Sequence, residues 1–111
     1  MSNNQNVPIL TPEQRKIALD KALEARKVRA KVAEMLSNGE LTIEELLETT
    51  DKYVKRMKIE KILRCFPGIG KARVPRIMDR LDISMNRSIA GLGERQKKAL
   101  INFINEEVEE N

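Results

Sequence analysis

A turn punctuated by glycines contains the residues whose types and spacing point to a chemistry. Phe66-Pro67-Gly68-Ile69-Gly70-Lys71 follows an apolar segment with helical spacing, and Pro67-Gly68 ends that helix. Gly68 and Gly70 permit positive φ and leave backbone N–H groups without a Cβ beside them. The cations that follow are Lys71, Arg73 and Arg76. Amides, a helix start and cations at one place predict an anion site, with phosphate as the candidate ligand. The alternative is a plain corner between two helices.

A second glycine turn repeats this residue order 23 positions further along the chain, as Ile89-Ala90-Gly91-Leu92-Gly93. The cations beside it are Arg87, Arg95, Lys97 and Lys98. The last three fall near the start of the final helix, where the helix dipole disfavours each by about 0.3–1 kcal/mol, so their placement indicates a bound anion. We predict that both turns lie on one side of a small domain and contact a polyanion at two points. Ile69 and Leu92 at the turn tips are expected in the core rather than in a minor groove, with the Ile69 amide still available to a phosphate.

One long helix is expected before the first turn. Thr11, Pro12 and Gln14 supply its N-cap and capping box, and Asn38-Gly39 supplies its stop. The roughly 26 residues between them span about 40 Å. The face expected to meet the core comprises Ile17, Ala18, Ala25, Val28, Val32, Met35 and Leu36. Lys21 interrupts this face, so part of the helix is expected to extend beyond the core.

Another side of the same helix carries Arg15, Arg26 and Arg29 without an acidic neighbour. Two interpretations stay open for it: a second phosphate contact, to which Lys58 would also belong, or a solvated flank. The segment after the helix has five acidic residues between positions 40 and 51, which argues against a nucleic-acid contact there.

Four further helices are expected to complete an all-α fold. Thr42 to Glu45 is a capping box that opens a short helix, and a helix of Lys58 to Cys65 precedes the first turn. The next helix begins near Val74, because Pro75 fits only a first helical turn. The last helix runs from Gly93 to about Val108, and it is expected to bury Leu100, Ile101, Phe103, Ile104 and Val108.

Composition narrows the class of protein. The chain of 111 residues has three aromatic residues and no β-strand pattern, so we divide one all-α unit into a flexible N-terminus (1–10), a long helix (11–39) and a compact domain (40–111). Residues 52 to 98 contain fourteen Lys or Arg and four acidic residues, as expected for a polyanion partner. Cys65 is the only cysteine and the chain has no His, so we predict no disulfide, no metal site and no cofactor. We find no secretion signal and no apolar run of membrane length, and we expect a cytoplasmic protein.

Five motifs, taken together and in order, resemble the actinobacterial-type integration host factors. They are Thr11–Arg15, Arg56–Lys58, Pro67–Arg73, Arg76–Met78 and Gly91–Gly93. The resemblance covers nearly all of the chain after residue 10, and its specificity comes from the order and spacing, because Pro-Gly-Ile-Gly alone occurs in many helix-hairpin-helix proteins. It implies a long N-terminal helix on a helix-two-turns-helix domain that binds duplex DNA with little sequence preference and bends or compacts it in the nucleoid. The DNA-backbone contacts that it implies are Gly68, Gly70, Lys71, Arg73, Arg76, Gly91 and Gly93. Pro75 departs from the expected pattern of that family.

We therefore predict a non-enzymatic protein whose partner is double-stranded DNA, with no membrane or small-molecule partner and a monomeric state off DNA. Three alternatives stay open. A structured-RNA binder of the ribosomal type would use the same phosphate chemistry. A DNA lyase or glycosylase would need a lysine nucleophile beside an acid, and Lys71 has no acidic neighbour in the sequence. A protein-interaction adaptor would use the long helix as a coiled-coil partner, although its apolar face departs from a strict heptad.

Overall fold

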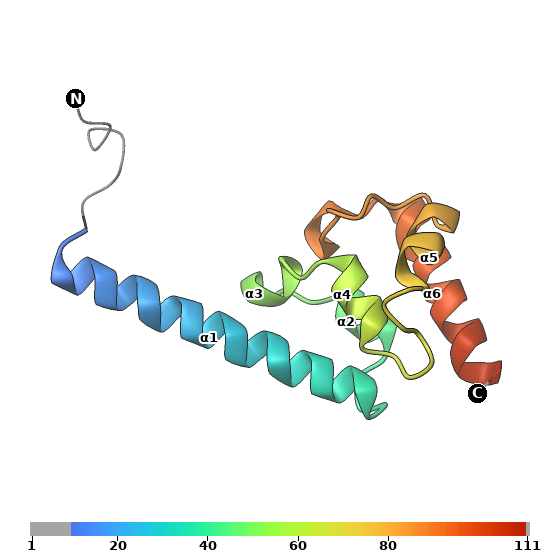
Figure 1. The fold of residues 1–111 in the computed structure, drawn as a ribbon, viewed down its shortest axis with the longest axis horizontal. Coiled ribbons are helices and arrows are strands. Elements are labelled where there is room, and N and C mark those ends of the chain that lie inside the picture. The colour runs from blue at the N-terminus through green and yellow to red at the C-terminus, as the bar shows by residue number, and fades with distance from the viewer. Residues whose placement is uncertain (1–9, 111) are drawn as a thin grey trace.

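The protein folds into six α-helices and one 3₁₀ helix over residues 10–110, which are the residues that the computed structural model describes (Figure 1). The helices are α1 (Pro12–Ser37), α2 (Ile43–Leu47), α3 (Lys52–Lys55), α4 (Ile59–Arg64), α5 (Val74–Arg80), the 3₁₀ helix η2 (Ile89–Gly91) and α6 (Glu94–Glu110). No strand forms in this part of the chain, so the all-α prediction is confirmed. Most of the expected flexible N-terminus, residues 1–9, lies outside the described residues.

Both ends of α1 are fixed by the residues expected there. Thr11 Oγ1 accepts the Gln14 amide at 3.1 Å and Gln14 Oε1 accepts the Thr11 amide at 2.9 Å, which completes the capping box. At the other end Gly39 takes φ 77°, and the amide of Glu40 donates to the carbonyl of Met35 at 2.9 Å. This left-handed residue with its backward hydrogen bond is a Schellman stop, which glycine adopts without a Cβ clash.

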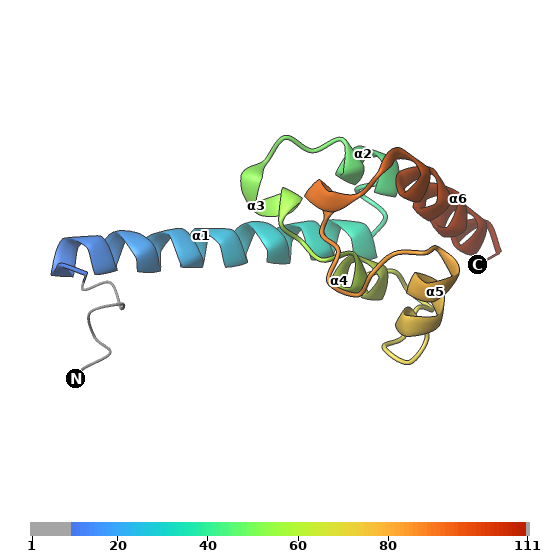
Figure 2. The same ribbon diagram turned by 90° about the horizontal axis from the view of Figure 1, so that it is seen from above.

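Only the C-terminal half of α1 packs on the rest of the molecule (Figures 1 and 2). Ala25 and Leu36 are buried, whereas Ile17, Leu19 and Leu23 are 50 to 57% exposed. The expected extension beyond the core is therefore present, but the prediction that Ile17 and Ala18 face the core is wrong. The radius of gyration of 17.2 Å, against about 13 Å for a compact chain of about 100 residues, reflects this projecting helix.

The core lies among α2, α4, α5 and α6, with Leu36 contributed by α1. Ile59, Ile62 and Leu63 of α4 have no exposed area, and Leu100 and Ile104 of α6 are buried beside them. Ile101 and Phe103 are partly buried against this core. Val108 is 60% exposed, so its expected burial is wrong: α6 continues past the last element that covers it.

Two short helices after α1 are set by their own N-caps. The amide and the hydroxyl of Thr42 both donate hydrogen bonds to the Glu45 carboxylate. These two bonds lower the pKa of Glu45 from its ordinary value. Asp51 Oδ1 accepts hydrogen bonds from the amides of Tyr53 and Val54 and so caps the helix α3. Within residues 10–110 no helix is both long and apolar enough to cross a membrane.

Candidate nucleic-acid interface

The first glycine turn, residues 66–73, joins α4 to α5. Gly68 takes φ 89°, a backbone conformation that glycine adopts without the steric penalty of a side chain. The Ile69 side chain is buried, as expected, but its amide donates to the Phe66 carbonyl at 3.2 Å and is not available to a phosphate. Gly70 has no positive φ, and a Cβ built on it would meet nothing within 4 Å. The backbone conformation therefore favours glycine at position 68 and does not favour it at position 70.

Several backbone amides of this turn point at no acceptor. Across the described residues, the N–H groups of Gly68, Gly70, Lys71 and Ala72 have no hydrogen-bond partner. All four residues are exposed, so these donors are accessible to a ligand from solvent. Successive free donors in a turn, as at positions 70–72, are backbone groups of the kind that can bind an anion.

The predicted cations of the first turn fall into two groups. Lys71 and Arg76 are exposed and make no ion pair or hydrogen bond within residues 10–110. Arg73 instead donates from Nη1 to the Gly68 carbonyl at 2.8 Å and from Nη2 to Glu107 Oε1 at 2.8 Å. The structure thus leaves Lys71 and Arg76 available to a phosphate and ties Arg73 to the turn and to α6. Helix α5 begins at Val74 with Pro75 as its second residue, which agrees with the start predicted from Pro75.

The second glycine turn, residues 89–93, has a different backbone. Its first part is the 3₁₀ helix η2, and neither Gly91 nor Gly93 takes a positive φ. The Gly91 amide donates to the Ser88 carbonyl at 3.0 Å, and the Gly93 amide donates to Gln96 Oε1 at 3.0 Å. Leu92 is buried, in agreement with its predicted place in the core. The amides expected to bind a phosphate here are already satisfied within the protein.

Arg87 lies across the second turn. Its Nη1 donates to the Gly91 carbonyl at 3.1 Å, and a Cβ on Gly91 would come within 2.9 Å of Arg87 Cδ. Glycine at position 91 therefore makes room for the arginine side chain. Together with Ser84, Asn86 and Ser88, these residues line a small polar pocket of about 330 Å³.

The two turns are apart in both views of the ribbon, and the chain between α5 and η2 connects them (Figures 1 and 2). Part of this connection runs antiparallel to the chain before α4, where the Ile59 amide donates to the Arg87 carbonyl and the Ile89 amide to the Met57 carbonyl. Lys58 Nζ donates to the Asn86 carbonyl at 2.8 Å. Lys58 is thus tied to the second turn rather than to the arginines of α1.

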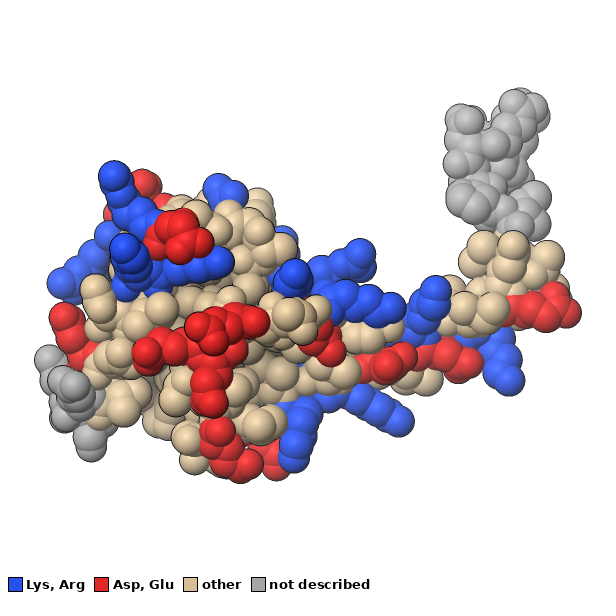
Figure 3. Space-filling view, turned by 180° about the vertical axis from the view of Figure 1, so that it is seen from behind, with Lys and Arg blue, Asp and Glu red and all other residues tan. Residues whose placement is uncertain are grey.

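The other predicted cations are distributed over α6 and α1. Arg95 and Lys98 are exposed at the start of α6, while Lys97 forms an ion pair with Glu94 at 3.6 Å. Arg15 and Arg26 are exposed on α1, and Arg29 is half-buried. Seen from behind, Lys and Arg gather along the upper edge of the compact part and the upper side of α1, while Asp and Glu form a band below them (Figure 3). On this face most Lys and Arg thus lie above the acidic band, while a few also project below it (Figure 3).

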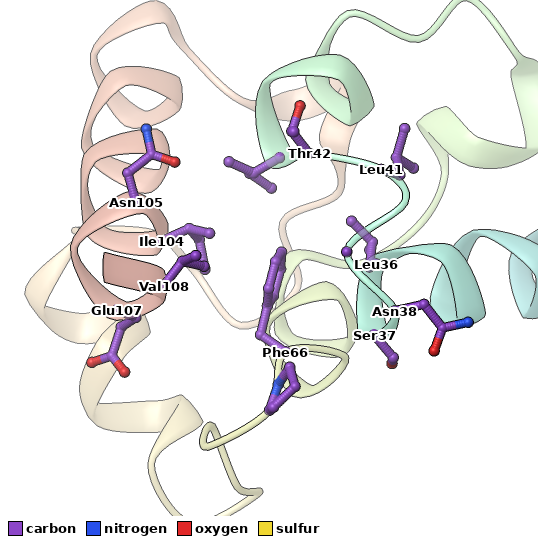
Figure 4. A pocket seen from close by; sticks show the side chains of 13 residues that line it. Leu36, Ser37, Asn38, Leu41, Thr42, Phe66, Ile104, Asn105, Glu107 and Val108 are labelled. Carbon is purple, nitrogen blue, oxygen red and sulfur yellow. The ribbon is translucent and has the colours of Figure 1, made fainter. Parts of the chain in front are cut away.

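An apolar groove of about 360 Å³ lies beside the first turn (Figure 4). Phe66 of the turn, Leu36 of α1 and Ile104 of α6 line it from three elements, and Glu107 stands at its edge.

The thiol of Cys65, next to Phe66, is half-buried. This burial raises the pKa of the thiol, while the nearby charge of Arg64 acts to lower it. In the described part of the chain no group of three or more potential metal ligands is found.

Two residues that shape the turns were missed in the sequence, Gln96 and Glu107. The role of Gln96 could have been predicted from its position as the third residue of α6. A Gln side chain there accepts a hydrogen bond from the amide of the residue before the helix, here Gly93. Its Nε2 also donates to the carbonyl of Asp82, which has φ 57°. Glu107 lies 34 residues from Arg73, and no local pattern connects them.

Comparison with known proteins identifies the domain first. Residues 36–103 match the family model of the S13-like H2TH domain, a helix-two-turns-helix fold. The chain is 39% identical over 97 residues to the integration host factor of Mycolicibacterium smegmatis. This match covers 86% of the chain and 92% of the relative. It is 40% identical over 96 residues to the integration host factor of Streptomyces coelicolor, covering 85% of this chain and 90% of the relative.

A solved structure agrees with these relatives. It is described as sIHF bound to an 8-base-pair palindromic DNA, with a TM-score of 0.73 and 34% identity over 76% of this chain and 97% of that one. The chain belongs to the integration host factor family of the actinobacterial type. The family resemblance predicted from the five sequence motifs is confirmed.

Proposed function

We propose that this protein binds duplex DNA through its phosphates with little sequence preference, and that it bends or compacts DNA as a nucleoid-associated architectural protein in the cytoplasm. The observation that carries the proposal is the row of free amides at residues 70–72, next to the unpaired side chains of Lys71 and Arg76. The DNA-bound solved structure and the integration host factor relatives support the same partner.

The proposed mechanism is backbone readout. A phosphate accepts hydrogen bonds from the amides of residues 70–72 while Lys71 and Arg76 neutralise neighbouring phosphates. Each neutralised phosphate releases condensed counterions, so log K falls with log salt by about 0.9 per contact. None of these donors reads a base edge, which accounts for the expected lack of sequence preference.

A second, weaker contact comes from cations rather than from backbone amides at the other turn. Arg95, Lys97 and Lys98 lie at the start of α6, and Arg87 lies over Gly91. The Gly91 and Gly93 amides are occupied, so we assign these two glycines a role in shaping the turn rather than in holding a phosphate. Arg15 on the projecting half of α1, and Arg26 where the helix begins to pack on the core, would reach a more distant DNA segment, and contacts spread in this way favour a bend.

The test is fluorescence anisotropy with a ~30-base-pair duplex of arbitrary sequence over a salt series. We expect micromolar or tighter binding at low salt, a steep loss of affinity as salt rises, and weak competition by duplex RNA of equal length. Absence of DNA binding at low salt would contradict the proposal. Clear preference for RNA would favour the structured-RNA function, which the S13-like character of the domain family keeps as the second candidate.

The same sample tests the monomeric state. We propose that the free protein is a monomer, so its sedimentation coefficient is expected to stay constant as its concentration rises. A concentration-dependent increase would instead favour an interaction role for the projecting helix.

A further inference from the structure

Arg73 contacts both glycines of the first turn and one residue of α6. Its side chain donates to the Gly68 carbonyl at 2.8 Å, and its amide donates to the Gly70 carbonyl at 3.0 Å. The same guanidinium donates to both carboxylate oxygens of Glu107, at 2.8 and 3.4 Å. One residue thus links the backbone of the turn to a helix 34 positions away.

These contacts set the direction of the free amides. No peptide bond in the described residues is cis, so the carbonyl of Gly70 and the N–H of Lys71 point in opposite directions. Because the Gly70 carbonyl points at the Arg73 amide, the Lys71 N–H points away from the Arg73 amide. The Arg73 side chain acts on the turn at the Gly68 carbonyl, and this hydrogen bond holds the residue with positive φ that precedes the free amides.

Glu107 is one of the partners that hold the Arg73 side chain in place. Its side chain is 19% exposed and that of Arg73 is 45% exposed, so the carboxylate is the less solvated partner of the pair. A carboxylate near a phosphate-binding surface repels the phosphate, so its presence there needs a compensating role. Glu107 has such a role if it holds the Arg73 guanidinium, which can bind a carboxylate through two parallel hydrogen bonds.

We propose that Glu107 is a positioning residue of the DNA-binding surface: through Arg73 it holds the first glycine turn in the conformation that presents the amides of residues 70–72. Arg73 is then a positioning residue as well, not a phosphate ligand. This inference rests on the proposed function, because it assigns these residues a part in the same binding surface.

The test compares Glu107→Gln with Glu106→Gln in the anisotropy assay. Glu106 is exposed on the same helix and makes no hydrogen bond or ion pair within residues 10–110, so its substitution removes the same charge without breaking a contact. We expect Glu107→Gln to weaken DNA binding on the order of five-fold, as for a lost coupling between contacting residues. Glu106→Gln should bind DNA equally well or slightly more tightly, because it only removes a repelling charge.

Two further variants separate positioning from direct contact. Arg73→Gln is expected to weaken binding while leaving the salt slope unchanged, and the double variant Arg73→Gln with Glu107→Gln should be no weaker than the weaker single variant. Arg73→Lys keeps the charge and loses the fork, so it should also bind more weakly than the wild type. A salt slope that falls by about 0.9 in Arg73→Gln would mean a direct phosphate contact and would overturn the inference.

Amide spectra of the free proteins provide a readout independent of DNA. The resonances of residues 70–72 are expected to shift in Glu107→Gln and to stay in place in Glu106→Gln. If the wild type binds DNA and Glu107→Gln binds it as tightly as Glu106→Gln, the positioning role is wrong while the proposed function stands. If the wild type does not bind DNA, the proposed function itself fails, and this inference fails with it.

Discussion

The two glycine turns share a residue order but use their glycines in different ways. In the first turn Gly68 takes a positive φ, Gly70 has open space around it, and the amides of residues 70–72 have no partner in the described chain. In the second turn the amides of Gly91 and Gly93 are both satisfied, and Gly91 makes room for Arg87. A repeated motif therefore indicates a repeated place in the fold, whereas the hydrogen bonds of each copy decide whether it can bind a ligand.

Reversing the two free cations of the first turn should have the largest effect. Lys71→Glu with Arg76→Glu is expected to reduce DNA affinity on the order of 100-fold and to lower the salt slope by about 1.8, since two phosphate contacts are lost. The matched control is Lys16→Glu with Lys27→Glu, which makes the same change of net charge at exposed positions of α1. Equal losses in the two double variants would mean that net charge alone sets the affinity.

The backbone of the first turn predicts the next effect, on stability. Gly68→Ala places a Cβ on a residue with φ 89° and should lower the free energy of unfolding by about 1–2 kcal/mol. Urea denaturation measures this change, with Gly70→Ala as the control. Because Gly70 has no positive φ and no neighbour within 4 Å, its alanine variant should be unchanged or up to about 1 kcal/mol more stable.

The same Gly70→Ala variant should bind DNA more weakly even though it is stably folded. A phosphate held by the amides of residues 70–72 leaves little room for a methyl group, and we expect a loss on the order of five-fold. Gly93→Ala is the counterpart in the second turn, where the nearest atom to a new Cβ is Gln96 Oε1 at 3.8 Å. If Gly93→Ala costs as much affinity as Gly70→Ala, the proposed difference between the turns is wrong.

Gly91→Ala should have the smallest effect. Its Cβ would displace the Arg87 side chain, which is flexible, and the hydrogen bond to the Gly91 carbonyl would be lost. We expect less than about a three-fold change in DNA affinity, because one cation moves without leaving the surface. A loss as large as that of the Lys71 and Arg76 variant would place the main contact at the second turn.

The sequence was most informative where one residue type has one structural meaning. The capping boxes at Thr11 and Thr42, the glycine stop at residue 39 and the helix start at Pro75 were all predicted and are all present. These features depend on neighbours within five residues, so the local sequence contains the whole interaction.

The failures concern partners that are distant in the sequence. A helical wheel shows which face of α1 is apolar but not how far another element covers it, and for this reason Ile17 and Ala18 were wrongly assigned to the core. The same limit applies to Val108 at the end of α6. The ion pair of Arg73 with Glu107 joins residues 34 positions apart and is likewise visible only in three dimensions.

The ¹H–¹⁵N spectrum of the protein, recorded during titration with an arbitrary duplex, shows whether the free amides of the first turn meet a phosphate. The amide resonances of Gly70, Lys71 and Ala72 are expected to shift the most, and those of Gly91 and Gly93 the least among the turn residues. Saturable shifts centred on Gly91 and Gly93, with residues 70–72 unmoved while DNA binds, would contradict the account.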